Sequence, residues 1–198
     1  MRAVTLLFDN LPDAKFRMLV PDPPWRYGDN LPGKGRGATK HYTTLTPAEI
    51  ATLPIPDLAE RDAHLWLWTT NSFMADALWL AKHWGFEHKT ILTWCKPQIG
   101  MGRYLRNTTE HCVLSVRGKL PWQGPLNIPS HFVAPRQQHS RKPQAAYDII
   151  VLGSPEERLE MFAREPRPGF HAWGNETLEA PKSKPTPQWT LFLPEGVE

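Results

Sequence analysis

Short apolar runs alternate with amphipathic segments along most of this chain. The run His64–Trp68 is continuously apolar, which is the pattern of a strand buried on both faces of a sheet. Runs of similar length occur at four further places and are bounded by turn-forming or polar residues. We therefore predict strands at 16–20, 64–68, 89–94, 110–116 and 159–163.

The segments between these runs carry helical periodicity. From Phe73 to Trp84 apolar residues recur at positions 73/74, 77/78, 81 and 84, and Gly85 follows as a C-terminal stop signal. A shorter helix begins at Pro47, and a third runs from Pro143 and ends at Gly153. Strands that alternate with helices predict an α/β fold with a mostly parallel central sheet.

A chain of 198 residues is long enough for one domain with a sizeable core. We assign residues 1–178 to this domain and residues 179–198 to a Pro-rich C-terminal tail. No apolar stretch approaches the roughly 20 residues of a membrane span, and the N-terminus lacks the pattern of a signal peptide, so we expect a cytoplasmic protein. Cys95 and Cys112 lie inside apolar runs without further metal ligands nearby, and we expect two buried thiols and no metal site.

The net charge of +3 is modest, but the charges are unevenly distributed. From Lys96 to Lys142 the chain has eight Lys or Arg residues and a single acid, Glu110. Acids outnumber bases after Gly153. A basic segment rich in loop residues is typical of a surface that contacts a polyanion, although scattered solvated charges give the same pattern. We favour contact with nucleic acid.

The most informative motif, Asp22-Pro23-Pro24-Trp25, directly follows the first predicted strand. Ligands of open α/β sheets bind beyond the carboxyl ends of strands, so the motif occupies a position typical of a site. The two prolines fix φ and remove two N–H donors, which leaves a carboxylate and rigid carbonyl oxygens beside an indole ring. The ordinary alternative is a turn acid, because Asp-Pro dipeptides are frequent in turns.

The chemistry of this motif suits an exocyclic amine such as that of adenine. The lone pair of this amine is delocalised into the ring, and two acceptors on its two N–H bonds would concentrate the lone pair on nitrogen. Asp22 supplies one acceptor, the carbonyl of Pro23 or Pro24 supplies the other, and Trp25 stacks on a flipped-out base. The remaining requirement is an electrophile held in line, and a sulfonium methyl donor fits.

Several other motifs follow in a fixed order, and together they resemble the N6-adenine methyltransferases related to the catalytic subunit of the eukaryotic mRNA adenosine methyltransferase. Bacterial and phage members of that family have similarly compact chains. The resemblance extends from about Lys15 to Glu176. It rests on Asp22–Trp25, Leu65–Thr69, Trp84–Phe86, Thr93–Lys96, Glu110–Leu114, Ser140–Pro143, Phe162–Arg164 and Pro168–Glu176.

This resemblance implies a Rossmann-like methyltransferase with S-adenosylmethionine as the methyl donor and a permuted order of motifs, in which the catalytic motif precedes the donor-binding segment. Asp22 and Pro24 would hold the target amine near the methyl group. The cation pair Lys142 and Arg164 would contact the donor. The residues that the resemblance places at the donor are Asp22, Lys142, Arg164, Asn175 and Glu176, the last two at the ribose.

The resemblance also implies a nucleic-acid substrate. The stretch from Tyr27 to Tyr42 is Gly-rich and basic, and we expect it to face the base and to influence substrate choice. The candidate contacts to base or phosphate are Tyr27, Tyr42, Lys96, Arg103 and Arg106.

We expect site-specific methylation of adenine in DNA, because the compact chain is more like the prokaryotic relatives. The same reaction on RNA is one alternative. A non-catalytic relative that binds nucleic acid or scaffolds a partner is another, and the intact Asp22 and prolines argue against it. A small domain has limited surface to hold a duplex and flip a base, so a homodimer or a partner subunit is compatible with this size.

Overall fold

A mixed α/β sheet forms the centre of the protein in the computed structural model, which describes residues 11–28, 44–100, 102, 104–137 and 141–174. Within these residues the sheet has seven strands in the order β5-β3-β4-β2-β1-β6-β7. The strands are β1 (Phe16–Pro21), β2 (Ala59–Thr69), β3 (Glu87–Cys95), β4 (Thr109–Arg117), β5 (His131–Val133), β6 (Arg158–Met161) and β7 (Phe170–Trp173). The helical elements are α2 (Pro47–Ala51), α3 (Ile55–Leu58), η2 (Asn71–Phe73), α4 (Met74–His83) and α5 (Gln144–Gly153).

The sheet is mostly parallel, as the sequence predicts. Strand β1 pairs in parallel with β2 and β6, β6 with β7, and β3 with β5. Strand β4 is antiparallel to both of its neighbours, β2 and β3. The carboxyl ends of β1, β2, β3 and β6 therefore lie at one edge of the sheet, together with the amino end of β4.

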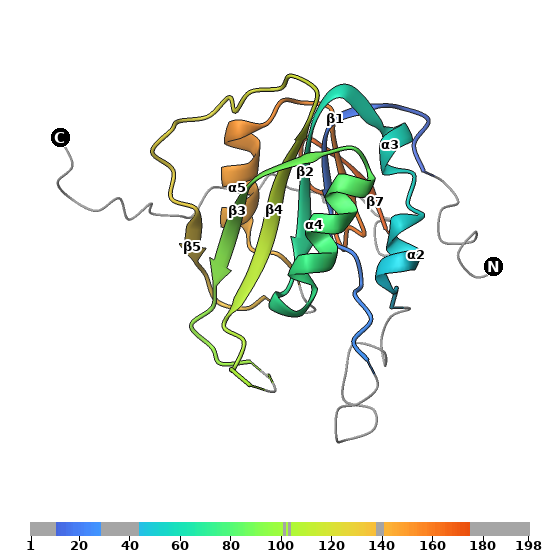
Figure 1. Ribbon diagram of the computed structural model, residues 1–198. Helices are drawn as coiled ribbons and strands as arrows, with labels where there is room; N and C mark the ends of the chain where they lie inside the picture. The colour runs from blue at the N-terminus through green and yellow to red at the C-terminus, as the bar shows by residue number, and fades with distance from the viewer. Residues whose placement is uncertain (1–10, 29–43, 101, 103, 138–140, 175–198) are drawn as a thin grey trace.

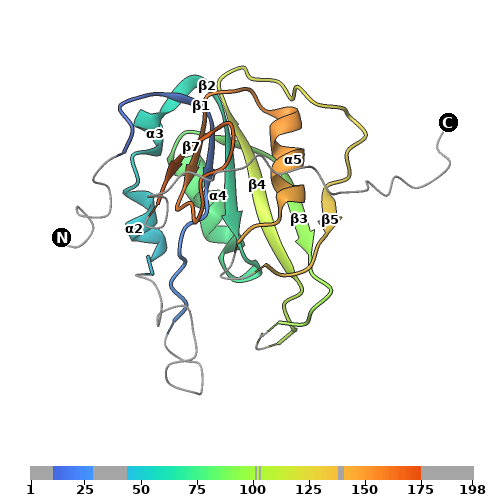
Figure 2. The same ribbon diagram turned by 180° about the vertical axis from the view of Figure 1, so that it is seen from behind.

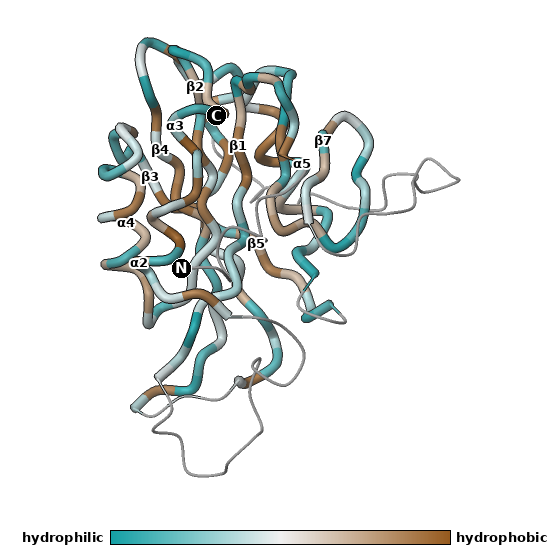
Figure 3. The backbone as a smooth tube through the Cα atoms, turned by 90° about the vertical axis from the view of Figure 1, so that its right-hand side faces the viewer, coloured by the Kyte–Doolittle hydropathy of each residue, from teal (hydrophilic) through white to brown (hydrophobic). Residues whose placement is uncertain are grey.

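Helices cover both faces of this sheet. Helices α2, α3 and α4 lie on one face and α5 lies on the other (Figures 1 and 2). Leu65 and Leu67 pack into the core on the α4 side, whereas Trp66 and Trp68 pack with Tyr147 of α5. Side chains of successive strand residues point to opposite faces, so a strand covered on both faces needs an apolar residue at every position. Figure 3 shows hydrophobic residues concentrated along these interior strands.

The ends of the helices follow from local chemistry. Thr46 caps α2 by accepting from the backbone N–H of Glu49, whose side chain accepts in turn from the N–H of Thr46. Gly85 follows α4 with φ +81°, and the N–H of Phe86 donates to the carbonyl of Ala81 at 2.9 Å. This is a glycine-dependent helix end, because residues with a Cβ rarely adopt that φ.

The predicted helix end at Gly153 is confirmed, whereas the predicted end of the last strand is wrong for a local reason. Gly153 is the last residue of α5, and its lack of a side chain serves packing: a Cβ there would lie 1.7 Å from the ring of Trp122. Strand β6 ends at Met161 instead of continuing to residue 163, because Phe162 has φ +63°.

Three short elements, α3, β5 and β7, are absent from the predicted set. Each has three or four residues, which is too short for a hydrophobic period to show. Cys112 is buried as predicted, whereas Cys95 is half-buried. No helix in the described ranges is long and apolar enough to span a membrane. The predicted tail at 179–198 lies outside the described residues.

Candidate active site

The candidate site lies at the edge of the sheet where β1, β2, β3 and β6 end. Asp22 is the first residue after β1, and its backbone N–H donates to the carbonyl of Met161 at 3.2 Å. This bond continues the pairing between β1 and β6 and fixes the backbone at Asp22. Its side chain is 23% exposed, so the carboxylate is open to a ligand on one side only.

The two prolines hold the motif in a defined conformation. Asp22 and Pro24 are half-buried, whereas Pro23 and Trp25 are buried. The carbonyl of Pro23 accepts from the N–H of Trp25 at 2.9 Å, and the carbonyl of Pro24 accepts from the N–H of Leu45 at 2.7 Å. A carbonyl oxygen has two lone pairs, so each can accept one further hydrogen bond.

The structure gives Trp25 a packing role. Its side chain is 6% exposed, and its ring stacks on Phe73 with 5.0 Å between centroids. The indole N–H donates to the carbonyl of Trp68 at 3.1 Å. A buried ring that already stacks on a neighbour does not offer its face to a base. In this conformation η2 and the end of β2 enclose the ring, so stacking of Trp25 on a base stays a prediction and requires the ring to be uncovered.

Four charged side chains form a connected row at this edge, which we call the charge network: Asp22, Lys142, Glu110 and Lys96. The ammonium of Lys142 lies 2.6 Å from Oδ2 of Asp22 and 3.4 Å from Oε2 of Glu110. Lys96 donates to the other oxygen of Glu110. Both lysine side chains are 8% exposed, so each depends on its carboxylate partners for compensation of its charge.

Burial and charge act in opposition on the pKa values of this network. Burial raises the pKa of Asp22, and Lys142 opposes that rise. Burial acts to lower the pKa of Lys142, but Asp22 and Glu110 outweigh it and the pKa is raised. Burial acts to raise the pKa of Glu110, but Lys142 and Lys96 outweigh it and the pKa is lowered. Burial lowers the pKa of Lys96, with Glu110 opposing. Mutual attraction thus outweighs burial at Lys142 and Glu110, whereas it only partly offsets burial at Asp22 and Lys96.

Comparison with known proteins places this fold and site in a family. The family model MT-A70 matches residues 16–176. The chain belongs to the MT-A70 family. Members of this family are methyltransferases.

Several proteins named as methyltransferases are similar in sequence to this MT-A70 protein. The chain is 33% identical over 197 residues to the type II methyltransferase M.MunI of a Mycoplasma species, covering 90% of this chain and 83% of that one. It is 31% identical over 174 residues to the human N(6)-adenosine-methyltransferase catalytic subunit METTL3, covering 82% and 28%. The human N(6)-adenine-specific methyltransferase METTL4 is 29% identical over 194 residues, covering 83% and 38%. The chain thus spans most of the length of the Mycoplasma protein and about a third of the human ones.

The sequence-predicted donor residues of this MT-A70 protein lie partly within the described structure. Asp22 and Lys142, 120 positions apart, are brought into direct contact. Arg164 follows β6 and is half-buried, and its charge acts to lower the pKa of Asp22, against the larger effect of burial. Asn175 and Glu176 lie outside the described residues.

The predicted substrate contacts lie in different parts of the structure. Tyr27 is 42% exposed at the site edge, and its hydroxyl lies 2.8 Å from Oγ1 of Thr70. Arg106 is exposed on the loop between β3 and β4. Lys96 belongs to the charge network and its side chain is 8% exposed, and its contact with base or phosphate stays a prediction. The other two candidates, Tyr42 and Arg103, lie outside the described residues.

A second buried cluster, which was not predicted from the sequence, joins β6 and α5 next to the site. Glu160 of β6 accepts a hydrogen bond from the hydroxyl of Tyr147 in α5 and lies 3.4 Å from Nε of Arg167. The guanidinium of Arg167 lies 3.5 Å from the centroid of the Tyr147 ring. These contacts hold α5 against β6. Because Lys142 lies two residues before Gln144, the first residue of α5, the cluster also fixes the position of Lys142. The sequence signal was Glu160 itself, an acid inside an apolar strand.

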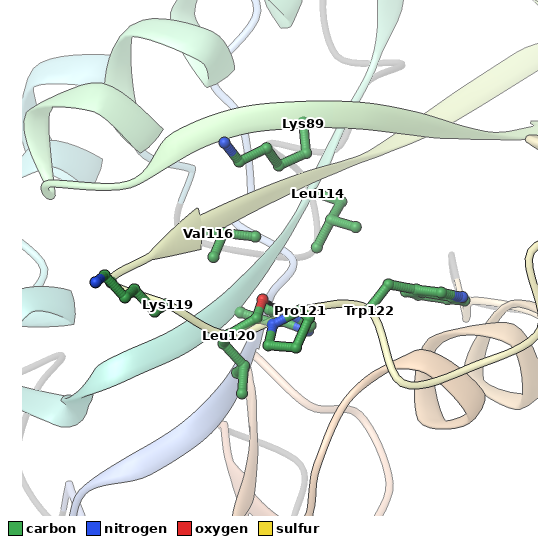
Figure 4. A pocket seen from close by; sticks show the side chains of 9 residues that line it. Lys89, Leu114, Val116, Lys119, Leu120, Pro121 and Trp122 are labelled. Atoms are coloured by element: carbon green, nitrogen blue, oxygen red, sulfur yellow. Dashed lines mark hydrogen bonds between the residues drawn. The ribbon is translucent and has the colours of Figure 1, made fainter.

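A hollow of about 430 Å³ lies toward the opposite edge of the sheet (Figure 4). Apolar residues of β4 and the following segment form its floor, and Lys89 and Lys119 lie at its rim. Its lining includes none of the charge network. The hollow is therefore separate from the candidate site around Asp22.

The sequence points to Glu110 as an unusual acid, but no role in the site was predicted for it. It is the single acid between Lys96 and Lys142, and it pairs with exactly these two lysines in the structure. A lone acid in a basic segment was the available signal. Its significance depended on the antiparallel register of β3 and β4, which places Glu110 opposite Trp94.

Proposed function

We propose that this protein is an S-adenosylmethionine-dependent methyltransferase that transfers a methyl group to the N6 amino group of adenine in DNA. The observation that carries the proposal is the partly exposed Asp22 carboxylate, held by β1 and paired with Lys142 in a chain of a methyltransferase family. Adenine-N6 chemistry agrees with the names of its relatives, which include adenine-specific and adenosine methyltransferases.

The charges at the site fit the methionine end of S-adenosylmethionine. That end carries an ammonium and a carboxylate, and the site offers the carboxylate of Asp22 and the cations of Lys142 and Arg164. S-adenosylmethionine supplies an electrophilic methyl group on a sulfonium sulfur. Asn175 and Glu176 stay predicted contacts to its ribose.

Asp22 and the carbonyl of Pro24 would together hold the target amine, and Asp22 would also stabilise the charge that forms on it. Its carboxylate accepts a hydrogen bond from one N–H, and the free lone pair of the Pro24 carbonyl accepts from the other. We favour Pro24 over Pro23 because Pro24 is half-buried, like Asp22, whereas Pro23 is buried. As the N–C bond would form and the S–CH3 bond would break to leave a neutral thioether, the amine nitrogen would become positively charged, and the carboxylate would stabilise that charge until the nitrogen released a proton to water. Lys142 and Glu110 keep Asp22 oriented.

DNA is the substrate that the similarity favours. The match to the bacterial type II methyltransferase covers 83% of that protein and 90% of this chain. RNA is the second candidate, because the match to METTL3, named as an adenosine methyltransferase, covers 82% of this chain. That match covers 28% of METTL3, which leaves most of the human protein without a counterpart in this chain.

The test is a nucleoside assay by mass spectrometry. Wild type, Asp22→Asn and the matched control Asp57→Asn, which alters an exposed acid of α3, are incubated with S-adenosylmethionine and unmethylated DNA or RNA. We expect N6-methyldeoxyadenosine from wild type and control, and a rate lower by about 10²–10³-fold for Asp22→Asn. Absence of methylated adenine from wild type on both polymers would overturn the proposal. Faster methylation of RNA would replace DNA with the second candidate.

A further inference from the structure

The connection between β3 and β4 projects beyond the edge of the sheet on the side of the candidate site (Figure 1). The two strands pair through Cys95 and Thr109, and the pairing continues into the connection. The N–H of Lys96 donates to the carbonyl of Thr108 at 2.7 Å, and the N–H of Gly100 donates to the carbonyl of Asn107 at 2.9 Å. The connection is therefore a hairpin with a paired stem.

Further contacts fix the shape of this hairpin. The N–H of Arg136 donates to Oε1 of Gln98 at 3.2 Å, which ties the stem to the segment after β5. A Cβ on Gly102 would lie 1.9 Å from the carbonyl oxygen of Leu105, so the turn approaches itself too closely for any side chain there. The sequence thus specifies a compact turn that holds the following residues outward.

The end of the hairpin carries large apolar side chains in water. Tyr104 is 99% exposed and Leu105 is 83% exposed, and Arg106 beside them is also exposed. Adjacent large apolar residues at a projecting tip indicate an interaction site more strongly than scattered ones do. Proteins that open a duplex insert apolar side chains between base steps and hold the backbone with neighbouring cations. Tyr104, Leu105 and Arg106 provide this combination.

The stem of the hairpin is joined to Asp22 through the charge network. Lys96 and Glu110 lie on its two arms, and Glu110 connects through Lys142 to Asp22 at the distances given above. Half of the hairpin between Lys96 and Thr108 is about six residues, which reach at most roughly 20 Å when extended. This exceeds the depth of a duplex groove, roughly 8.5 Å. The tip can therefore enter a duplex that lies against the site.

We propose that Tyr104 and Leu105 form a wedge that enters the base stack of duplex DNA beside the target adenine and fills the space left when that base moves out to Asp22. The proposal rests on the proposed function. The wedge replaces stacking contacts that the flipped base loses, and Arg106 contacts a flanking phosphate. Its contribution is then larger for paired substrates, because an unpaired base costs less to move out of the duplex.

The experiment compares two duplexes of the same sequence. The methylated site is first mapped on DNA treated with wild type; one duplex is then fully paired, and the other has an abasic site opposite the target adenine. The variants are Tyr104→Ala/Leu105→Ala and Tyr104→Phe. The matched control is Leu126→Ala, which alters a 94% exposed leucine in the segment between β4 and β5.

We expect the double variant to lose at least about tenfold in kcat/KM on the paired duplex and to stay within about threefold of wild type on the abasic duplex. Leu126→Ala should behave as wild type on both, and Tyr104→Phe, which keeps the aromatic ring, should retain more activity on the paired duplex than the double variant. Equal losses on the two duplexes, or no loss on the paired one, would overturn the wedge. A changed oligomeric state of the double variant in light scattering would overturn it in favour of a protein interface. Wild type that methylates neither duplex would overturn the proposed function, whereas active wild type with an unaffected double variant would overturn the wedge alone.

Discussion

Glu110→Gln removes one negative charge from the charge network while keeping the size of the side chain. Glu110 is the shared partner of two lysines that are each 8% exposed. In the variant Lys142 retains Asp22 at 2.6 Å, but Lys96 loses the carboxylate that compensates its charge. The substitution therefore leaves one buried ammonium without a partner among the carboxylates of the network.

The distances give a magnitude for this loss. At an effective dielectric constant of about 20, the 3.4 Å contact of Glu110 with Lys142, which the variant loses in addition to the contact with Lys96, is worth roughly 5 kcal/mol of Coulomb attraction. Breaking a buried pair by removing one partner typically costs about 3–5 kcal/mol. The Glu110 side chain is 22% exposed, so water recovers part of that cost. We expect the free energy of unfolding to fall by about 2–4 kcal/mol at neutral pH.

Urea unfolding followed by circular dichroism measures the difference in unfolding free energy between wild type and Glu110→Gln. The pH dependence of that difference is a second test. The folded-state pKa of Glu110 lies below its ordinary value of 4.5, so its stabilisation is present above that pH and is lost as the pH falls through the folded-state pKa. The gap between wild type and Glu110→Gln should therefore narrow in acid. Adding Lys96→Met removes the uncompensated ammonium, and the double variant should be more stable than Glu110→Gln alone.

Glu87→Gln is the matched control, because Glu87 also pairs with a lysine, Lys89 at 2.7 Å, but is 79% exposed. Water screens such a surface pair, and its loss should change the unfolding curve little. The reasoning fails if Glu110→Gln unfolds like this control. It also fails if adding Lys96→Met brings no recovery, since the unpaired ammonium would then not be the source of the loss.

Two further predictions follow from the motif itself. Trp25→Phe removes the N–H that donates to the buried carbonyl of Trp68, and we expect a loss of about 1–3 kcal/mol in thermal or urea unfolding; wild-type stability would contradict the packing role of Trp25. Burial raises the pKa of Asp22, so a reaction that needs its carboxylate should slow as the pH falls, with a midpoint above the ordinary 3.8. An initial-rate profile of the folded enzyme that stays flat to that pH would exclude the role.

Much of the fold could be predicted because it depends on residues near one another in the chain. The apolar run at 64–68 indicated a strand covered on both faces, and β2 is such a strand. The stop at Gly85 and the cap at Thr46 are local signals, and both are present in the structure. Short edge strands such as β5 lack such a signal, because three residues pair with β3 only after the sheet has formed.

The candidate site could be predicted only in part, because its geometry depends on contacts between distant segments. Asp22 and Lys142 were each assigned to the donor, yet their direct pairing required β1 and the segment before α5 to meet at one edge. Trp25 was assigned to the base because its ring follows the acid and the prolines. Its burial against Phe73 depends on how η2 packs, which no pattern around Trp25 reveals.

The alternation of charge in the network explains how one carboxylate can serve a reaction that creates positive charge. A buried Asp22 alone would favour its neutral form, which cannot stabilise a cationic amine. Lys142 keeps Asp22 charged but places a second positive charge beside the methylated nitrogen, which opposes the reaction. Glu110 offsets that charge, since one of its oxygens lies 3.4 Å from the ammonium of Lys142 and the other bonds to Lys96. The carboxylate of Asp22 thus faces the amine with its partner already neutralised, and this effect depends on Glu110 although Glu110 need not touch the substrate.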